Sequence, residues 1–184
     1  VNIDCNSILA CGPEQKVTFS FGLDDRVIVS QHIGDLDNID TYEFYTETID
    51  RYKKLFRTEP QLVACDMHPD YLSTRLALDS GLPHYGVQHH AAHIFSVAAE
   101  HGITGRILGL ALDGTGLGDD NTIWGGELLL IDNRPEANLS DCPGADGNNY
   151  CRLGHLARML LPGGDAAART PWRMAQSLLS QVGV

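Results

Sequence analysis

The alternation of apolar and polar positions predicts three short strands at the start of the chain. Apolar runs at Ile8–Cys11, Lys16–Phe21 and Arg26–Ser30 are separated by Gly12-Pro13 and by Gly22-Leu23-Asp24-Asp25. Residues of these types favour tight turns between strands. We therefore expect the three strands to pair as an antiparallel meander.

A helical repeat follows the meander. Tyr45, Ile49, Tyr52 and Phe56 recur at spacings that place them on one face of a helix, and residues 40–43 have the acidic cap pattern that begins one. This helix should pack on the sheet. Further along, the pattern predicts a strand at 62–65, a helix at 73–79 closed by Gly81, a helix at 89–101 closed by Gly102, and strands at 106–112 and 122–131.

The remaining segments are expected to be turns and loops. Residues 113–121 should form a turn that presents Gly114 to Gly116 at its tip, and the composition of residues 133–150 predicts a long surface loop. A last helix should begin near Ala166. Mixed strands and helices of this kind indicate an α/β fold, with two lobes around a cleft.

Composition and charge exclude some functions. A chain of 184 residues with 43% hydrophobic content has enough apolar residues for a core, and its formal net charge of −11 argues against a surface that binds nucleic acid. The acidic side chains of residues 34–50 are interpreted as a solvent-exposed helix face and the loop that leads into it. Arginines gather after Cys151, either to meet an anionic ligand or as scattered surface residues; they are Arg152, Arg158, Arg169 and Arg173.

Cysteine spacing and hydropathy indicate the compartment. The five cysteines form no C-x-x-C pair and are odd in number, so we expect reduced thiols in a cytoplasmic protein. No apolar stretch approaches the roughly 20 residues that span a bilayer, and no membrane association is expected.

The histidines of the predicted helix at 89–101 form a candidate metal site. His89 and His93 are four residues apart, which places both side chains on one helix face, whereas the neighbouring His90 points in another direction. Asp113, at a strand end, is a suitable third ligand, and such a set leaves positions open for water or substrate. Zinc and iron both fit these donors. The alternative is two polar helix positions with ordinary hydrogen bonds.

Glycines near Asp113 form a candidate phosphate site. Backbone N–H groups of Gly114, Thr115 and Gly116 could wrap a phosphate, although a simple turn explains the same residues. Gly125 and Gly126 lie inside a predicted strand, where glycine marks either the close approach of a ligand or a structural bulge.

Two further segments carry polar residues at positions that could face a cleft. Asp66 and His68 follow a buried strand and are candidate site residues; alternatively, Asp66 caps the next turn and His68 lies on the surface. Residues 161–165, Leu-Pro-Gly-Gly-Asp, are either a plain loop or an anion-facing helix start.

Five segments in order resemble the HypF family, the carbamoyltransferases that mature nickel–iron hydrogenases. They are Ser30–Leu36, Cys65–Thr74, Val87–His93, Leu112–Glu127 and Leu161–Ala167. The resemblance runs over nearly all the chain. It implies an actin-like ATPase (ribonuclease H-like) fold, with residues 1–104 as the first lobe and residues 105–184 as the start of the second.

The resemblance also implies the roles of the candidate residues. His89 and His93 would bind the metal with Asp113 as the third ligand, and the glycine segments would line a pocket for nucleotide and carbamoyl-adenylate. The family's acylphosphatase, zinc-finger and adenylating domains are not in this sequence, nor is the rest of the transferase domain. The chain therefore resembles the first half of the transferase domain, either as a fragment or as a shortened relative, and is expected to be incomplete by itself.

The reaction that the resemblance implies is ATP-dependent, with carbamoyl phosphate as the carbamoyl source. A carbamoyl group would pass from the adenylate to the C-terminal cysteine thiol of a HypE-type partner, on the way to the cyanide ligands of the hydrogenase. The alternative is a catalytically inactive half-domain that binds nucleotide or a partner protein.

Overall fold

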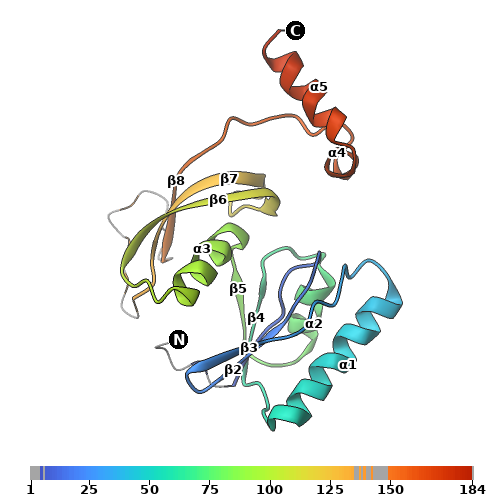
Figure 1. Cartoon of the computed structure of the whole chain (residues 1–184), viewed down its shortest axis with the longest axis vertical. Helices are drawn as coiled ribbons and strands as arrows, with labels where there is room; N and C mark the ends of the chain where they lie inside the picture. The colour runs from blue at the N-terminus through green and yellow to red at the C-terminus, as the bar shows by residue number, and fades with distance from the viewer. Residues whose placement is uncertain are drawn as a thin grey trace.

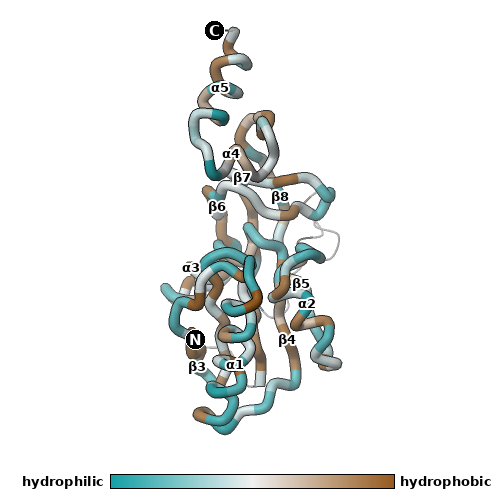
Figure 2. The backbone as a smooth tube through the Cα atoms, turned by 90° about the vertical axis from the view of Figure 1, so that its right-hand side faces the viewer, coloured by the Kyte–Doolittle hydropathy of each residue, from teal (hydrophilic) through white to brown (hydrophobic). Residues whose placement is uncertain are grey.

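The computed structural model describes Cys5, residues 7–134, Ala137, Leu139, Cys142 and residues 149–183. Two sheets follow each other along the long axis, and two helices extend beyond the second sheet (Figure 1 and Figure 2). The elements are β1 (Ile8–Ala10), β2 (Ser20–Leu23), β3 (Arg26–Val29), α1 (Ile39–Phe56), β4 (Leu62–Asp66), α2 (Leu72–Asp79), β5 (His84–Val87), α3 (His89–Glu100), β6 (Arg106–Leu117), β7 (Ile123–Asp132), β8 (Tyr150–His155), α4 (Asp165–Arg169) and α5 (Pro171–Gln181).

The first sheet has the strand order β3-β2-β1-β4-β5. The antiparallel β1–β2 and β2–β3 pairs confirm the predicted meander, while β1–β4 and β4–β5 are parallel. The second predicted strand begins four residues late, at Ser20, because Val17 instead bridges Gly34. The parallel register places Asp66 beside Val87, so the end of β4 lies next to the start of α3.

Helices α1 and α2 supply side chains to the core of the first sheet. Tyr45 and Ile49 of α1 and Ala77 of α2 are buried with Phe19 and Phe21. The Tyr45 hydroxyl donates to the Cys11 carbonyl at 2.7 Å, so this buried polar group is satisfied. Helix α1 begins after Asn38, whose side chain accepts from the backbone of Thr41.

The second sheet has the order β6-β7-β8, and both pairs are antiparallel. Helix α3 packs across one face of β6 and β7, where Ile94 joins Leu129 and Ile131 in a second core. Gly109 of β6 makes this packing possible, because a Cβ there would overlap the side chain of Ile94. On the other face, Leu108, Leu110 and Leu112 are exposed.

The predicted turn at residues 113–121 was wrong in its extent. β6 continues to Leu117, so Gly114 to Gly116 lie within the strand and the hairpin turns at residues 118–121. Local hydrogen bonds explain the turn: Asp120 accepts from the backbone and hydroxyl of Thr122 and from the indole of Trp124. Asn121 adopts a positive φ of 58°, which asparagine tolerates. A register shift between Leu112 and Gly116 marks a bulge.

The expectation that all five cysteines are free was also wrong. Cys142 and Cys151 form a disulfide, whereas Cys5, Cys11 and Cys65 are free. The bond forms because β8 places Cys151 next to Cys142. The two cysteines form no C-x-x-C pair, so the sequence pattern did not indicate that they are close.

Strands β5 and β8 were not predicted from the pattern. The predicted loop at residues 133–150 falls largely outside the described residues. Within the described part of the chain, no helix combines the length and apolar character needed to cross a membrane.

Candidate metal centre and its surroundings

Gln88 fixes the start of helix α3, which carries the candidate histidines. Its side-chain oxygen accepts from the backbone of Ala91 at 2.8 Å, which caps the helix, and its amide nitrogen donates to the Leu117 carbonyl at 3.1 Å. The residue is 1% exposed. One buried glutamine therefore ties the helix start to the end of β6. Sequence reasoning missed this residue, although its position just before the histidine helix is a capping signal.

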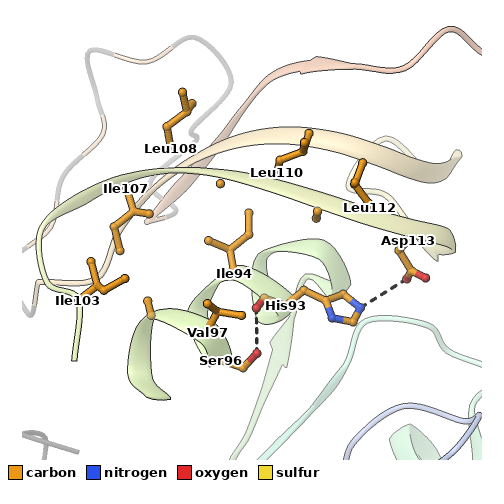
Figure 3. Close-up of a pocket in the computed structure, with 13 residues that line it drawn as sticks. His93, Ile94, Ser96, Val97, Ile103, Ile107, Leu108, Leu110, Leu112 and Asp113 are labelled. Atoms are coloured by element: carbon orange, nitrogen blue, oxygen red, sulfur yellow. Dashed lines mark hydrogen bonds and ion pairs between the residues drawn. The ribbon is translucent and has the colours of Figure 1, made fainter. Parts of the chain in front are cut away.

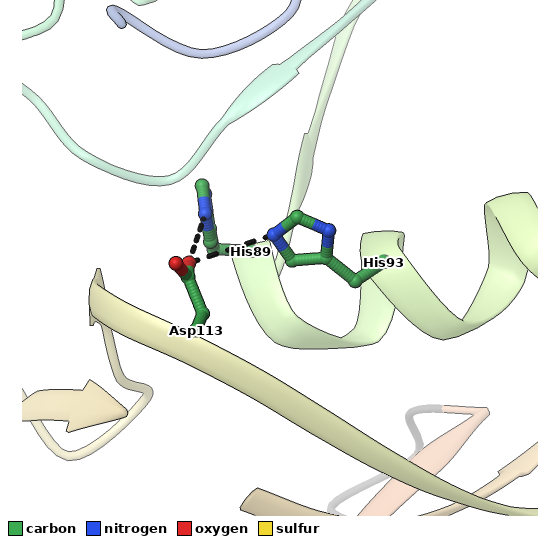
Figure 4. Close-up of side chains that lie close together, drawn as sticks. All are labelled: His89, His93 and Asp113. Atoms are coloured by element: carbon green, nitrogen blue, oxygen red, sulfur yellow. Dashed lines mark ion pairs between the residues drawn. The ribbon is translucent and has the colours of Figure 1, made fainter. Parts of the chain in front are cut away.

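The structure brings His89, His93 and Asp113 together, as predicted (Figure 4). Oδ2 of Asp113 lies 2.8 Å from Nε2 of His89 and 3.5 Å from Nε2 of His93. His89 and Asp113 are largely covered, whereas the His93 side chain is 55% exposed. The group therefore has one closed side and one side open to solvent.

Neighbouring charges shift the protonation of this group. A hydrogen bond to Asp66 raises the pKa of His89 against the opposing effect of burial, and the charges of Asp66 and Asp113 raise it further. Although partial burial works against it, the pKa of Asp113 is lowered, because its carboxylate accepts from the Gly114 backbone and faces both histidines. The site thus favours an ionised carboxylate.

The donor set fits a divalent metal. Imidazole nitrogen and carboxylate oxygen bind zinc at about 2.0–2.2 Å, so donors that share an ion lie within about 4 Å of one another. Here one atom from each of the three side chains lies within 4.8 Å of the other two, so a small side-chain movement would bring all three to the distances of a bound ion. Two imidazoles and one carboxylate suit zinc or ferrous iron and leave coordination positions open.

Asp66, a predicted cleft residue, contacts this group in two ways. Its Oδ1 accepts from the His68 backbone at 2.8 Å, and its Oδ2 lies 2.7 Å from Nδ1 of His89. Asp66 therefore caps the turn and also contacts His89, while its role as a site residue stays a prediction. His68 stacks on Tyr71 at 4.3 Å between ring centroids and is not part of the donor group.

His90 does not face the metal donors, as its position in the helix predicts. It is fully buried, with its ring 5.9 Å from that of Trp124. Burial, followed by the nearby His89, lowers its pKa. A Cβ added to Gly116 would lie 2.7 Å from Cε1 of His90 and 3.0 Å from Cδ2 of His89. His90 is thus a core residue between the helix and the hairpin.

The predicted nucleotide glycines differ in their surroundings. Gly116 lies against the two histidines, and a Cβ at Gly126 would meet Cδ1 of Leu156 at 2.5 Å, so packing within the protein explains both. Gly114 has no atom within 4 Å of an added Cβ, and Gly125 faces the Gly114 carbonyl at ordinary contact distance. Gly114 and the exposed Thr115 are therefore the positions most accessible to a ligand.

A hollow of about 370 Å³ lies beside the donors, between α3 and β6 (Figure 3). His93 and Asp113 are at one end, and Ile94, Val97 and Ile107 are among the apolar residues along it. The five predicted nucleotide residues do not line this hollow. Their role in binding stays a prediction.

Glu127 and Arg152 form a buried ion pair next to the hairpin, which sequence reasoning missed. Nε of Arg152 lies 2.7 Å from Oε2 of Glu127, and the guanidinium covers the Trp124 ring at 4.1 Å. The other Glu127 oxygen accepts from the Gly125 backbone at 3.1 Å. A glutamate inside an otherwise apolar strand was the available signal.

The Leu-Pro-Gly-Gly-Asp segment leads into α4. Gly163 and Gly164 both have positive φ, a backbone conformation that glycine adopts more readily than other residues. This conformation fits both interpretations of the segment, and the choice between them stays a prediction.

Comparison with known proteins agrees with this architecture. The family model for the HypF Kae1-like domain matches residues 4–100, and the model for the second subdomain of the carbamoyltransferase Kae1-like domain matches residues 109–184. The crystal structure of full-length HypF in the phosphate- and nucleotide-bound form aligns with a TM-score of 0.83 and 41% identity, over 95% of this chain and 21% of that one. The expected fold class is thereby confirmed.

Relatives in sequence carry the same family name. Carbamoyltransferase HypF2 of Cupriavidus necator is 48% identical over 181 residues, which cover 96% of this chain and 21% of that protein. A carbamoyltransferase HypF homolog of the same organism is 39% identical over 94% of this chain and 41% of its own length. The chain thus spans only part of these relatives. By the match of both Kae1-like subdomain models, the chain belongs to the HypF family of carbamoyltransferases.

Proposed function

We propose that this chain provides the metal-binding part of a carbamoyltransferase site that serves hydrogenase maturation. The observation that carries the proposal is the convergence of His89, His93 and Asp113, within hydrogen-bonding or near-contact distance, in a chain whose relatives are named carbamoyltransferases. The open side of His93 leaves room for a substrate next to these donors.

Each residue of the site has a separate task in this proposal. A zinc or iron ion, when bound, would supply Lewis-acid polarisation of a carbonyl or phosphoryl oxygen. His89 and His93 would hold it through Nε2, and the ionised Asp113 would offset its charge. The backbone N–H group of Thr115 would donate to negative charge that develops on the substrate.

We propose carbamoyl-adenylate as the donor substrate and the C-terminal cysteine of a HypE-type protein as the acceptor. Because the thiol belongs to the partner, no nucleophile is required from this chain. ATP and carbamoyl phosphate would be consumed by domains outside these 184 residues. Support for a nucleotide comes from the HypF relative whose crystal structure is described as phosphate- and nucleotide-bound.

A catalytically inactive half-domain that binds nucleotide or a partner is the second candidate. The expected cytoplasmic location loses the support of five free thiols, because two of them form a disulfide. The proposed cytoplasmic location therefore rests on the family alone.

Zinc titration by calorimetry tests the metal site directly. His89→Ala and His93→Ala should each remove most of the affinity, whereas His101→Ala, an exposed residue at the end of the same helix, should leave it unchanged. His90→Ala is an unsuitable control, because that side chain is buried in the core. Equal losses in all three variants would contradict the ligand assignment.

An activity assay separates the two candidate functions. The purified chain, supplied with carbamoyl-adenylate and a HypE-type peptide that ends in cysteine, should transfer little, because it covers only part of its relatives. Strong transfer by the chain alone would show that it is a complete enzyme. In a full-length protein that contains this chain, transfer that is lost with His89→Ala supports the enzyme, and nucleotide binding without any transfer supports the inactive half-domain.

A further inference from the structure

The imidazole of His89 lies between two carboxylates from different sheets. Nδ1 is 2.7 Å from Oδ2 of Asp66, at the end of β4, and Nε2 is 2.8 Å from Oδ2 of Asp113, on β6. Asp66 is 8% exposed as a residue, whereas the Asp113 side chain is 29% exposed. Each ring nitrogen therefore faces a carboxylate, and the carboxylate of Asp66 is more buried than that of Asp113.

We infer that Asp66 is a positioning residue that holds the proton of His89 on Nδ1 and so leaves the lone pair of Nε2 for a metal ion. A neutral imidazole carries one proton and can donate it to only one of the two carboxylates that it faces. Asp66 is the less exposed of the two, and when Asp113 binds an ion Nε2 must supply a lone pair, so the proton is assigned to Nδ1. Carboxylates that bind the second nitrogen of a metal-binding histidine fix its ring and its tautomer in this way. The inference rests on the metal site proposed above.

The fold holds Asp66 in a fixed place for this role. Its backbone pairs with Val87 in the parallel β4–β5 ladder, directly before the helix that carries His89. The Asp66 carbonyl accepts from the buried Thr74 hydroxyl at 3.1 Å, and its Oδ1 accepts from the His68 backbone. Hydrogen bonds on both sides of the residue leave the carboxylate little freedom to turn away from His89.

His93 provides a contrast within the same site. Its side chain is more exposed than that of His89, and its nearest carboxylate contact is the 3.5 Å separation from Asp113. Among the described residues, no carboxylate forms an ion pair with its Nδ1. The structure therefore assigns the fixed ligand position to His89 and the adaptable one to His93.

Asp66→Asn tests this role with almost no change in shape. The oxygen of the new amide can still accept from the His68 backbone, but the NH₂ group faces Nδ1 of His89 as a donor. Nδ1 must then accept, and the proton moves to Nε2, the atom required by the metal. Zinc affinity should fall by about 10- to 100-fold, the usual loss for such partners. Asp70→Asn removes the same charge from an exposed residue of the same loop, and should change affinity by less than about twofold.

Long-range ¹H–¹⁵N spectra show which ring nitrogen of His89 carries the proton, and a purely structural role of Asp66 would not change this position. In the unmodified, metal-free chain, at a pH where the ring is neutral, His89 should carry its proton on Nδ1; in Asp66→Asn it should carry it on Nε2. A proton on Nε2 in the unmodified chain would overturn the inference even if Asp66→Asn does not fold. An Asp66→Asn protein that binds zinc as tightly as the unmodified chain would overturn it as well. Failure of the unmodified chain to bind zinc would refute the metal site instead, while the tautomer measurement would still decide the role of Asp66.

Discussion

Gly116→Ala should damage the site from inside the protein. The new methyl group would lie 2.7 Å from Cε1 of His90 and 3.0 Å from Cδ2 of His89, closer than real contacts allow. His90 is fully buried, with its ring 5.9 Å from that of Trp124, so its side chain is confined by the core. The methyl group must therefore displace the hairpin, His89, or both.

The expected magnitude follows from the cost of overpacking a core. Such substitutions cost about 1–3 kcal/mol, and 1 kcal/mol corresponds to roughly 2–4 °C of melting temperature in a chain of this size. The melting temperature should therefore fall by roughly 2–12 °C. Displacement of His89 from Asp113 should also weaken zinc binding, with each 1.4 kcal/mol of lost contact equal to about tenfold in affinity.

Gly114→Ala is the matched comparison, two residues away in the same strand. Among the residues that the structure describes, none has an atom within 4 Å of the added methyl group, and the φ of Gly114 is not positive, so the melting temperature and zinc affinity should be nearly unchanged. If the backbone at Gly114 lies against a nucleotide, this variant should lose nucleotide affinity while it keeps its stability. Thermal unfolding, zinc calorimetry and nucleotide titration on both variants measure these effects. Equal stability of the two variants would refute the packing argument.

Four more outcomes are expected from the charges and the disulfide. Zinc binding should weaken as the pH falls, starting above the ordinary histidine value of about 6.5, because both flanking carboxylates raise the pKa of His89; calorimetry at a series of pH values measures it. In the metal-free chain, the raised pKa of His89 stabilises the folded state at pH values below the pKa that His89 has in the unfolded chain. This stability is lost as the pH rises through the pKa of His89 in the folded chain, and urea unfolding at several pH values would detect the loss. Arg152→Ala should cost about 3–5 kcal/mol in urea unfolding, because it leaves the charge of Glu127 buried, whereas the exposed Arg158→Ala should cost less than about 0.5 kcal/mol. Reduction of the disulfide, whose cysteines are 9 residues apart, should lower stability by about 2–3 kcal/mol, and an unchanged urea midpoint in reductant would contradict this.

Local patterns were sufficient to predict the long and strongly periodic elements. The face of α1 that holds Tyr45 and Ile49 was evident from a helical repeat, and the four-residue spacing of His89 and His93 indicated that they share a side. Strand β5 was not recognised, because three of its four residues are exposed and its Gly86 lacks the apolar signal of a strand. Its partner β4 holds it in the sheet, and that information is not local.

The site shows the same division between local and long-range information. Spacing along one helix predicted two donors, and a strand end predicted the third. The approach of His90 to Gly116 and the pairing of Glu127 with Arg152 depend on how the hairpin folds over α3, which no local pattern contains. The hairpin tip was misplaced for a related reason: the bulge between Leu112 and Gly116 lets a glycine-rich segment continue as a strand.

The contacts of His89 with both sheets have a thermodynamic consequence. Asp66 belongs to the first sheet and Asp113 to the second, and His89, on the helix between them, contacts both. An ion bound by His89 and Asp113 favours the ring position of His89 that also contacts Asp66, so the measured metal affinity includes the free energy of placing the two sheets at this contact. By reciprocity, any ligand that favours the same orientation tightens metal binding by the factor by which the metal tightens that ligand. The ion would then stabilise the contact between the two sheets in addition to its role as a Lewis acid.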